Sequence, residues 1–260
     1  MQTLKVFSGL HLVGMITVEG AIWEFQYSGK WLAGDDTFPV SVSLPLQEAP
    51  FKNESVRAFF ANLLPEANIK ERLAKLHGVS SQNDFALLKV LGGECAGALS
   101  IIPEDEERSI DGAYAVLTKD DLYQKLTLLH QRPFIAASDE CRLSLAGAQN
   151  KLPVYRKGDD FFLPIGDFAS THIIKPPVEG YEGIVQNEAF CMTLAKRVGI
   201  DVPDVEVIDI KEKQVLLIAR YGRVIRDHKV IRKHQEDFCQ AMGVSYDRKY
   251  EFEGGPGLGD

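Results

Sequence analysis

The 260-residue sequence contains no run of about 18 apolar residues, so no segment is expected to cross a membrane as a helix. Its first residues lack the charged stretch followed by an apolar stretch that marks a secretory leader. The four cysteines lie far apart and form no C-x-x-C pair, which favours buried free thiols over disulfides or a zinc site. We therefore expect a cytoplasmic protein with no membrane partner.

An excess of positive charge is also missing. The chain has 29 Lys and Arg against 37 Asp and Glu, a net charge of -8, which argues against non-specific nucleic-acid binding by the chain as a whole. A local basic patch is still compatible with that balance. The sequence lacks the G-x-x-x-x-G-K-[ST], G-x-S-x-G, H-E-x-x-H and G-x-G-x-x-G signatures, and its six histidines do not pair at helical spacing. No metal site is expected.

The composition, with 45% hydrophobic and 25% charged residues, is that of an ordinary globular protein. The first part of the chain predicts short strands within residues 3–27, another strand at 38–44, and a strand at 96–102 that returns to the first sheet. Helical patterns lie between them, near residues 53–63, 65–76 and 85–91. These patterns indicate the α+β class.

A polar, charged stretch that begins at Pro103 marks a domain boundary. We assign residues 1–105 to a first domain, 106–117 to a linker and 118–260 to a second domain. In the second domain, Thr118 is a candidate helix N-cap. The expected strands of that domain are 151–155, 160–163, 171–175, 205–210 and 215–220. Two further helices are expected, a short one at 236–242 and a long one at Ile184–Val198. The long helix has an apolar face of Val185, Ala189, Met192, Ala195 and Val198.

Three segments of the second domain suggest chemistry. Ser144–Lys151 places small residues around Gly147 and ends in a lysine, a composition that lets backbone N–H groups approach an anion. A plain turn between two strands is the alternative. Lys175 ends a β-branched strand, and Glu188 lies near the start of the next helix, an order similar to the lysine and helix glutamate of protein kinases. A surface lysine and an exposed glutamate are the alternative there. Leu216–Arg223, an apolar strand running into a polar joint, is typical of a hinge between lobes.

Taken together, the segments resemble the HipA family, the toxin kinases of bacterial type II toxin–antitoxin systems. The resemblance extends over nearly the whole chain. The matching segments are Phe59–Glu66, Ser144–Lys151, Thr171–Pro176, Asn187-Glu188, Leu194–Lys196, Val202–Asp204, His234–Gln240, Lys249–Glu251 and Gly254–Gly257.

The resemblance implies a HipA-like N-terminal subdomain followed by the small lobe of a two-lobed, protein-kinase-like fold. It implies a Ser/Thr protein kinase that uses ATP and Mg²⁺. Its implied partners are a HipB-type antitoxin, operator DNA reached through that antitoxin, and a translation-factor substrate such as an aminoacyl-tRNA synthetase. By resemblance, Ser144 is a regulatory phosphorylation site and Glu188 the helix glutamate. The implied ATP-binding residues are Ala146, Gly147, Ala148, Gln149, Asn150, Lys151, Lys175, Ala219, Arg220 and Tyr221.

The family's catalytic Asp and metal ligands follow the Gly-Gly-Pro-Gly segment, and these 260 residues do not include them. We therefore expect very little phosphoryl transfer from this chain alone, since that reaction depends on Mg²⁺ and on positioning. Three alternatives stay open: a non-catalytic antitoxin-binding or co-repressor protein, one chain of a split kinase, or a truncation product. The hinge also differs, because the family has an acidic residue where Ala219 stands and an Asp where Gly222 stands.

Overall fold

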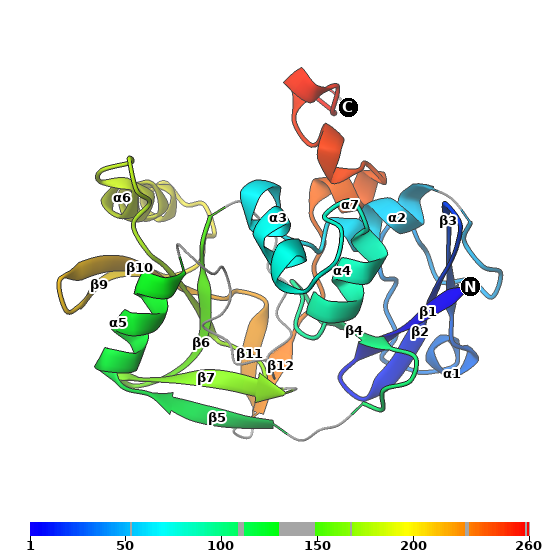
Figure 1. The fold of residues 1–260 in the computed structure, drawn as a ribbon, viewed down its shortest axis with the longest axis horizontal. Helices are drawn as coiled ribbons and strands as arrows, with labels where there is room; N and C mark the ends of the chain where they lie inside the picture. Colours follow the sequence, from blue (N-terminus) through cyan, green and yellow to red (C-terminus); the bar gives the residue numbers. More distant parts are fainter. Residues whose placement is uncertain are drawn as a thin grey trace. The chain divides into compact units, whose positions relative to one another are not determined.

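The computed structural model describes residues 1–52, 54–108, 112–129, 149–166, 168–226, 229–257 and 259 (Figure 1). The described residues form two compact units. The first contains residues from 1–110 and 234–260, and the second contains residues from 111–141 and 148–233. None of the helices in these described ranges is long and apolar enough to cross a membrane.

The first unit is built on a four-stranded antiparallel sheet with the strand order β3-β2-β1-β4. Gly9 and Gly20 adopt φ of 57° and 62° at the two hairpin turns, a conformation that glycine adopts without strain. The elements of this unit are β1 (Gln2–Ser8), β2 (His11–Glu19), β3 (Ile22–Tyr27), α1 (Gly29–Leu32), α2 (Glu54–Ala61), α3 (Ala67–Leu76), α4 (Asp84–Leu91), β4 (Leu99–Pro103), α7 (Phe238–Met242), η1 (Tyr246–Arg248) and η2 (Glu251–Glu253).

Apolar side chains from the sheet and from α2 fill the core of the first unit. Phe25 on β3 and Phe60 on α2 are fully buried, with ring centroids 5.4 Å apart. The return of β4 to the first sheet confirms the prediction for residues 96–102, and the expected helices near 53–63, 65–76 and 85–91 are α2, α3 and α4. Asn83 caps α4 through a side-chain bond from the N–H of Ala86 (3.0 Å).

The predicted strand at residues 38–44 is wrong. The segment forms only an isolated bridge between Ser41 and Leu44. Its alternating pattern is real, since Val40 is buried while Val42 is 68% exposed, but no neighbouring strand pairs with it. The N–H of Val40 donates to the hydroxyl of Tyr27 (2.8 Å) instead of to a neighbouring strand.

Residues 234–242 pack in the first unit, whereas the sequence-based division placed them with the second domain. The polar side chains of this segment make the contacts. Gln240 Nε2 donates to the carbonyl of Phe59 (2.9 Å), and the hydroxyl of Ser41 donates to Glu236 (2.6 Å). These partners lie almost 200 positions away in the sequence, beyond the reach of local pattern.

The second unit contains a six-stranded antiparallel sheet with the order β5-β7-β6-β8-β10-β9 and a separate ribbon of β11 and β12. Residues 112–117, within the stretch assigned to the linker, form β5 at the sheet edge. Its elements are β5 (Gly112–Leu117), α5 (Lys119–Leu128), β6 (Leu152–Lys157), β7 (Asp160–Gly166), β8 (His172–Lys175), α6 (Ile184–Arg197), β9 (Val205–Ile210), β10 (Lys213–Ala219), β11 (Arg223–Arg226) and β12 (Lys229–Arg232).

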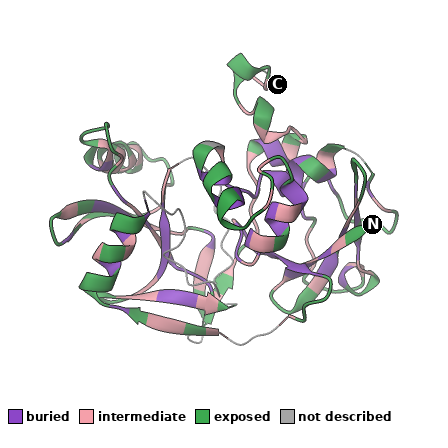
Figure 2. Ribbon diagram, viewed as in Figure 1, coloured by how far each residue is buried: buried purple, intermediate pink, exposed green. Residues whose placement is uncertain are grey.

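Helix α5 begins as predicted at Thr118, whose hydroxyl accepts from the N–H of Asp121 (3.1 Å). Its buried residues Leu122 and Leu126 join an apolar cluster with β6, β8 and β10. Helix α6 also forms as predicted, with Val185 buried and Ala189, Met192 and Ala195 half-buried. Figure 2 shows exposed and intermediate residues along this helix.

Two details of the predicted burial are wrong. Val198 is 67% exposed, because α6 ends at Arg197 and Val198 is its C-cap. Cys95 and Cys239 are buried free thiols as predicted, but Cys191 is exposed, because it lies on the outer side of α6. Cys141 lies outside the described residues.

Candidate functional site

The second unit joins Lys175 and Glu188 in an ion pair. Lys175 is the last residue of β8, and Glu188 lies on the second turn of α6. The Nζ–Oε1 distance is 2.5 Å, and the two side chains are 21% and 29% exposed. Partial burial limits screening by salt and water, so this pair is more rigidly held than a surface pair. The alternative of a free surface lysine and an exposed glutamate does not describe this geometry.

The end of the Ser144–Lys151 segment lies at the same end of the sheet as Lys175. Leu152 pairs with Ile174 in the antiparallel register. Lys151, just before Leu152, and Lys175, just after Ile174, therefore lie at the same end of the sheet. Lys151 is buried, and Asn150 is half-buried. Asn150 Oδ1 is enclosed and has no hydrogen-bond partner within the described ranges. A buried acceptor in that state favours a ligand that brings a donor.

Of the other expected ATP-binding and regulatory residues in that segment, Ser144, Ala146, Gly147 and Ala148 lie outside the described residues. Gln149 is described and half-buried beside Asn150.

The backbone at the end of β10 and in the joint that follows is hydrogen-bonded to the residues just before β9 and β8. Ala219 donates its N–H to the carbonyl of Asp204, and Arg220 donates its N–H to the carbonyl of Thr171, both at 2.9 Å. These two donors are therefore already used by the protein. Tyr221 follows, with 67% exposure, and its N–H has no partner among the residues that the structure describes. Of the three expected hinge residues, Tyr221 is the one with a backbone donor available to a ligand.

The register places the joint and the lysine on one line. Ala219 lies opposite His172, and Leu216 lies opposite Lys175. Three residues of extended strand span roughly 10 Å.

Buried polar residues at the start of β8 were missed by the sequence analysis. Ser170 is fully buried and accepts a bond from the Arg220 guanidinium (2.6 Å), while the Thr171 hydroxyl accepts the N–H of Arg156 (3.0 Å). Burial, together with the positive charge of Arg156, lowers the pKa of the adjoining His172. A single Ser-Thr dipeptide has no spacing pattern, so no sequence signal could have found it.

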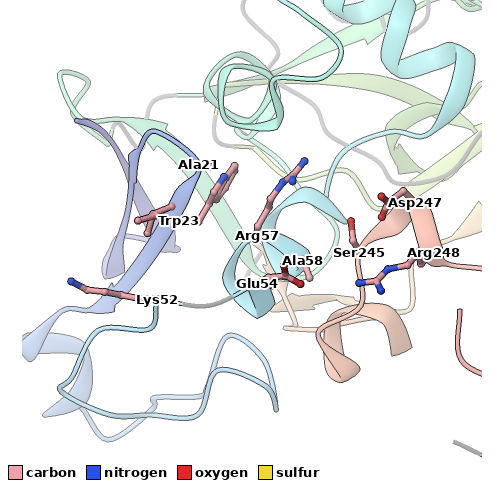
Figure 3. Close-up of a pocket in the computed structure, with 10 residues that line it drawn as sticks. Ala21, Trp23, Lys52, Glu54, Arg57, Ala58, Ser245, Asp247 and Arg248 are labelled. Carbon is pink, nitrogen blue, oxygen red and sulfur yellow. The ribbon is translucent and has the colours of Figure 1, made fainter. Parts of the chain in front are cut away.

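The first unit has a separate pocket of about 560 Å³. Figure 3 shows that its lining mixes charges of both signs with the side chain of Trp23. Lys52, Arg57 and Arg248 supply positive charge, and Glu54 and Asp247 supply negative charge, so no single ligand charge is favoured. None of the expected ATP-binding residues lines it.

The expected kinase chemistry requires two bound groups, ATP and Mg²⁺. Lys151, Lys175 and the free N–H of Tyr221 suit a nucleotide with its phosphates at the lysine end. Within the described ranges no group of three or more His, Cys, Asp or Glu side chains could hold a metal ion. The described residues therefore fit ATP and supply no complete set of Mg²⁺ ligands.

Comparison with known proteins shows what this arrangement is similar to. Residues 4–102 match the HipA N-terminal domain, and residues 143–258 match the HipA-like C-terminal domain. The putative kinase Y4mE of Sinorhizobium fredii is 41% identical over all of this chain and 64% of its own length. The serine/threonine-protein kinase toxin HipA of Shewanella oneidensis is 31% identical, over 98% of this chain and 58% of its own length.

A solved structure has the same fold. It is the chain described as the Shewanella oneidensis MR-1 toxin–antitoxin system of HipA, HipB and its operator DNA, with a TM-score of 0.81 and 29% identity. The match covers 98% of this chain and 60% of that one. The chain thus spans about 60% of the length of these relatives and has the N-terminal subdomain with part of the kinase-like fold. Together the two domain matches, the relatives and the shared fold show that the chain belongs to the HipA family.

Proposed function

We propose that the second unit binds ATP and is the nucleotide-binding part of a Ser/Thr protein kinase. The observation that carries the proposal is the Lys175–Glu188 ion pair between β8 and α6. Kinase-named relatives along the full chain support it. The coordinating Asp and Asn of the kinase reaction are expected in the part of the relatives that these residues do not match.

Each residue has a role that follows from its position. Glu188 holds the ammonium group of Lys175 at the end of β8, and Lys175 binds phosphate oxygens there. Lys151 adds a second positive charge at the same end of the sheet. Tyr221 binds the adenine through its backbone N–H, and Ala219 and Arg220 line the ring. Mg²⁺, when bound, neutralises charge on the phosphates.

The proposal is tested by thermal unfolding of the pure chain with and without Mg-ATP. At a ligand concentration about 100-fold above Kd, a single site stabilises by about 2.7 kcal/mol. For a chain of this size the midpoint is expected to rise by roughly 5–10 °C. Lys175→Ala is expected to lose that rise. Lys157→Ala, an exposed lysine at the end of the neighbouring strand β6, is the matched control and keeps it.

The variant Glu188→Gln distinguishes the role of Glu188, which positions Lys175, from that of Lys175, which contacts the phosphates. The amide keeps the shape of the side chain but loses the charge that holds Lys175, so the variant is expected to keep a reduced rise. An equal rise in wild type and Lys175→Ala would contradict the proposed site, as would the absence of any rise in the wild type.

A second role is favoured by one observation. The solved structure with the same fold comes from an assembly of toxin, antitoxin and operator DNA. We propose that this chain binds a HipB-type antitoxin and through it operator DNA, whether or not it transfers phosphate to a substrate such as an aminoacyl-tRNA synthetase. A stable complex with the antitoxin, unchanged by Mg-ATP, would favour a binding or co-repressor role. Phosphate on Ser144, beside the proposed phosphate loop, would then act as a regulatory charge.

A further inference from the structure

Positive charge gathers in one short segment of this acidic chain. Residues 220–233 carry six Lys and Arg and one Asp, a net charge of +5, whereas the whole chain has a net charge of -8. The six are Arg220, Arg223, Arg226, Lys229, Arg232 and Lys233. This segment is the local exception to the charge balance that argues against binding of nucleic acid.

The segment folds as a two-stranded antiparallel ribbon of β11 and β12, separate from the main sheet of the second unit. Its register sets Arg223 opposite Arg232 and Arg226 opposite Lys229. Arg226 and Lys229 are exposed, while Arg223 and Arg232 are half-buried. Arg223 Nη1 also donates to the carbonyl of Gly222 (3.0 Å), so Arg226 and Lys229 form the exposed cross-strand pair of like charge.

Such pairing is unfavourable for the ribbon by itself. Like charges directly opposite each other destabilise an antiparallel pair, and a lone two-stranded ribbon is marginal in water. At the base of the ribbon, the N–H of Lys233 donates to the carbonyl of Gly222 (2.8 Å). Ile225 and Ile231, between the charged positions, are 56% and 45% exposed. A dense anionic partner would relieve the repulsion and cover this surface.

From this geometry we propose that the β11–β12 ribbon is a contact surface for the phosphate backbone of duplex DNA. Each strand of the ribbon has four residues, about 13 Å at the usual rise. Duplex DNA carries one negative charge per about 1.7 Å of axis, so several phosphates face a surface of that length. An acidic protein surface rarely presents charge at that density. A two-stranded ribbon also fits the width of the major groove.

The inference goes beyond the proposed function, in which the chain reaches DNA only through an antitoxin. The contact is direct, and it needs neither ATP nor Lys175. Because Arg and Lys contacts to phosphate carry no base identity, the binding is expected to be independent of sequence and strongly dependent on salt.

The test measures fluorescence anisotropy of a labelled random-sequence DNA duplex with the pure 260-residue chain, in sodium chloride between about 50 and 200 mM. The double variant Arg226→Gln/Lys229→Gln is expected to bind at least about tenfold more weakly at the low-salt end. Its slope of log K against log salt is expected to be shallower by about 1.8, since each lost phosphate contact removes about 0.9.

A matched pair of substitutions controls for net charge. Lys75→Gln/Lys157→Gln removes the same two charges from exposed positions of α3 and β6 and is expected to keep the wild-type slope. Thermal unfolding controls for folding, because Arg226→Gln/Lys229→Gln removes a like-charge pair and should be at least as stable as wild type. Lys175→Ala is expected to bind DNA like wild type, which separates this test from that of the ATP site.

Three results would overturn the inference. One is an absence of duplex binding by the wild type at the low-salt end. Another is an unchanged slope in Arg226→Gln/Lys229→Gln. The third is tighter binding to a single-stranded RNA of equal length than to the duplex. In that case the ligand of the ribbon would be RNA and not duplex DNA.

Discussion

Replacing Asp84 with asparagine is expected to lower the free energy of unfolding by about 3–5 kcal/mol, the cost of removing one partner from a buried ion pair. The Asp84 side chain is 1% exposed at the start of α4. Its Oδ1 lies 2.6 Å from Lys70 Nζ, and its Oδ2 lies 2.9 Å from Arg57 Nη2. Without the carboxylate, the Lys70 side chain, which is 8% exposed, would lose its oppositely charged partner.

The same carboxylate joins three separate pieces of the first unit. Lys70 lies on α3, and Tyr246, in η1, places its hydroxyl 2.6 Å from Lys70 Nζ and 3.2 Å from Asp84 Oδ1. Arg57, on α2, points its guanidinium at Asp84 and also borders the pocket of Figure 3. Hydrogen bonding to Asp84 raises the pKa of Arg57. We therefore expect Asp84→Asn to loosen η1 as well as α3 and α4.

Urea denaturation of the pure chain measures the effect. Asp35→Asn, an exposed aspartate, is the control and should change stability by less than about 0.5 kcal/mol. The double variant Asp84→Asn/Lys70→Met, which removes the stranded charge, is expected to recover much of the loss. A loss below about 1 kcal/mol in Asp84→Asn would show that the site is open to water.

The ion pair of the candidate site could be predicted because it depends on short-range pattern. The apolar spacing from Val185 onward places α6, the β-branched run ending at Lys175 places β8, and a helix that follows a strand packs back on its sheet. Residue type then selects Glu188 as the partner of Lys175. The loop residues before Gln149 could be named from composition but not positioned, and they lie outside the described ranges.

Other features depend on contacts that no local pattern records. The N-cap of α4 is Asn83, and nothing in the sequence marks the next residue, Asp84, as the centre of a buried network with Tyr246. The ribbon of β11 and β12 was not predicted either, because its strands are only four residues long and rich in Arg and Lys, which are not strong strand formers. Edge strand β5 was also not predicted, because it lies in residues 106–117, which were assigned to a linker on account of the polar residues beside them.

Alkaline pH is expected to weaken the wild-type protein through Tyr27, and Tyr27→Phe is expected to lack that weakening. The Tyr27 ring is 4% exposed, and its hydroxyl donates to the carbonyl of Leu44 (2.5 Å) and accepts the N–H of Val40. Burial raises its pKa from 10.0 to about 12. Between those two values the unfolded chain loses the proton while the folded chain keeps it, so stability falls as pH rises.

The two-unit difference in pKa corresponds to about 3 kcal/mol lost between pH 10 and 12, since each unit is worth about 1.4 kcal/mol. Tyr27→Phe starts lower at neutral pH, by about 1–3 kcal/mol, because the buried N–H of Val40 loses its acceptor. Its stability should then fall less than that of wild type over the alkaline window. Urea denaturation at both ends of the window measures the difference. Tyr181→Phe, at a site that is 67% exposed, should follow the wild type, and parallel losses in Tyr27→Phe and wild type would mean that Tyr27 ionises freely in the folded protein.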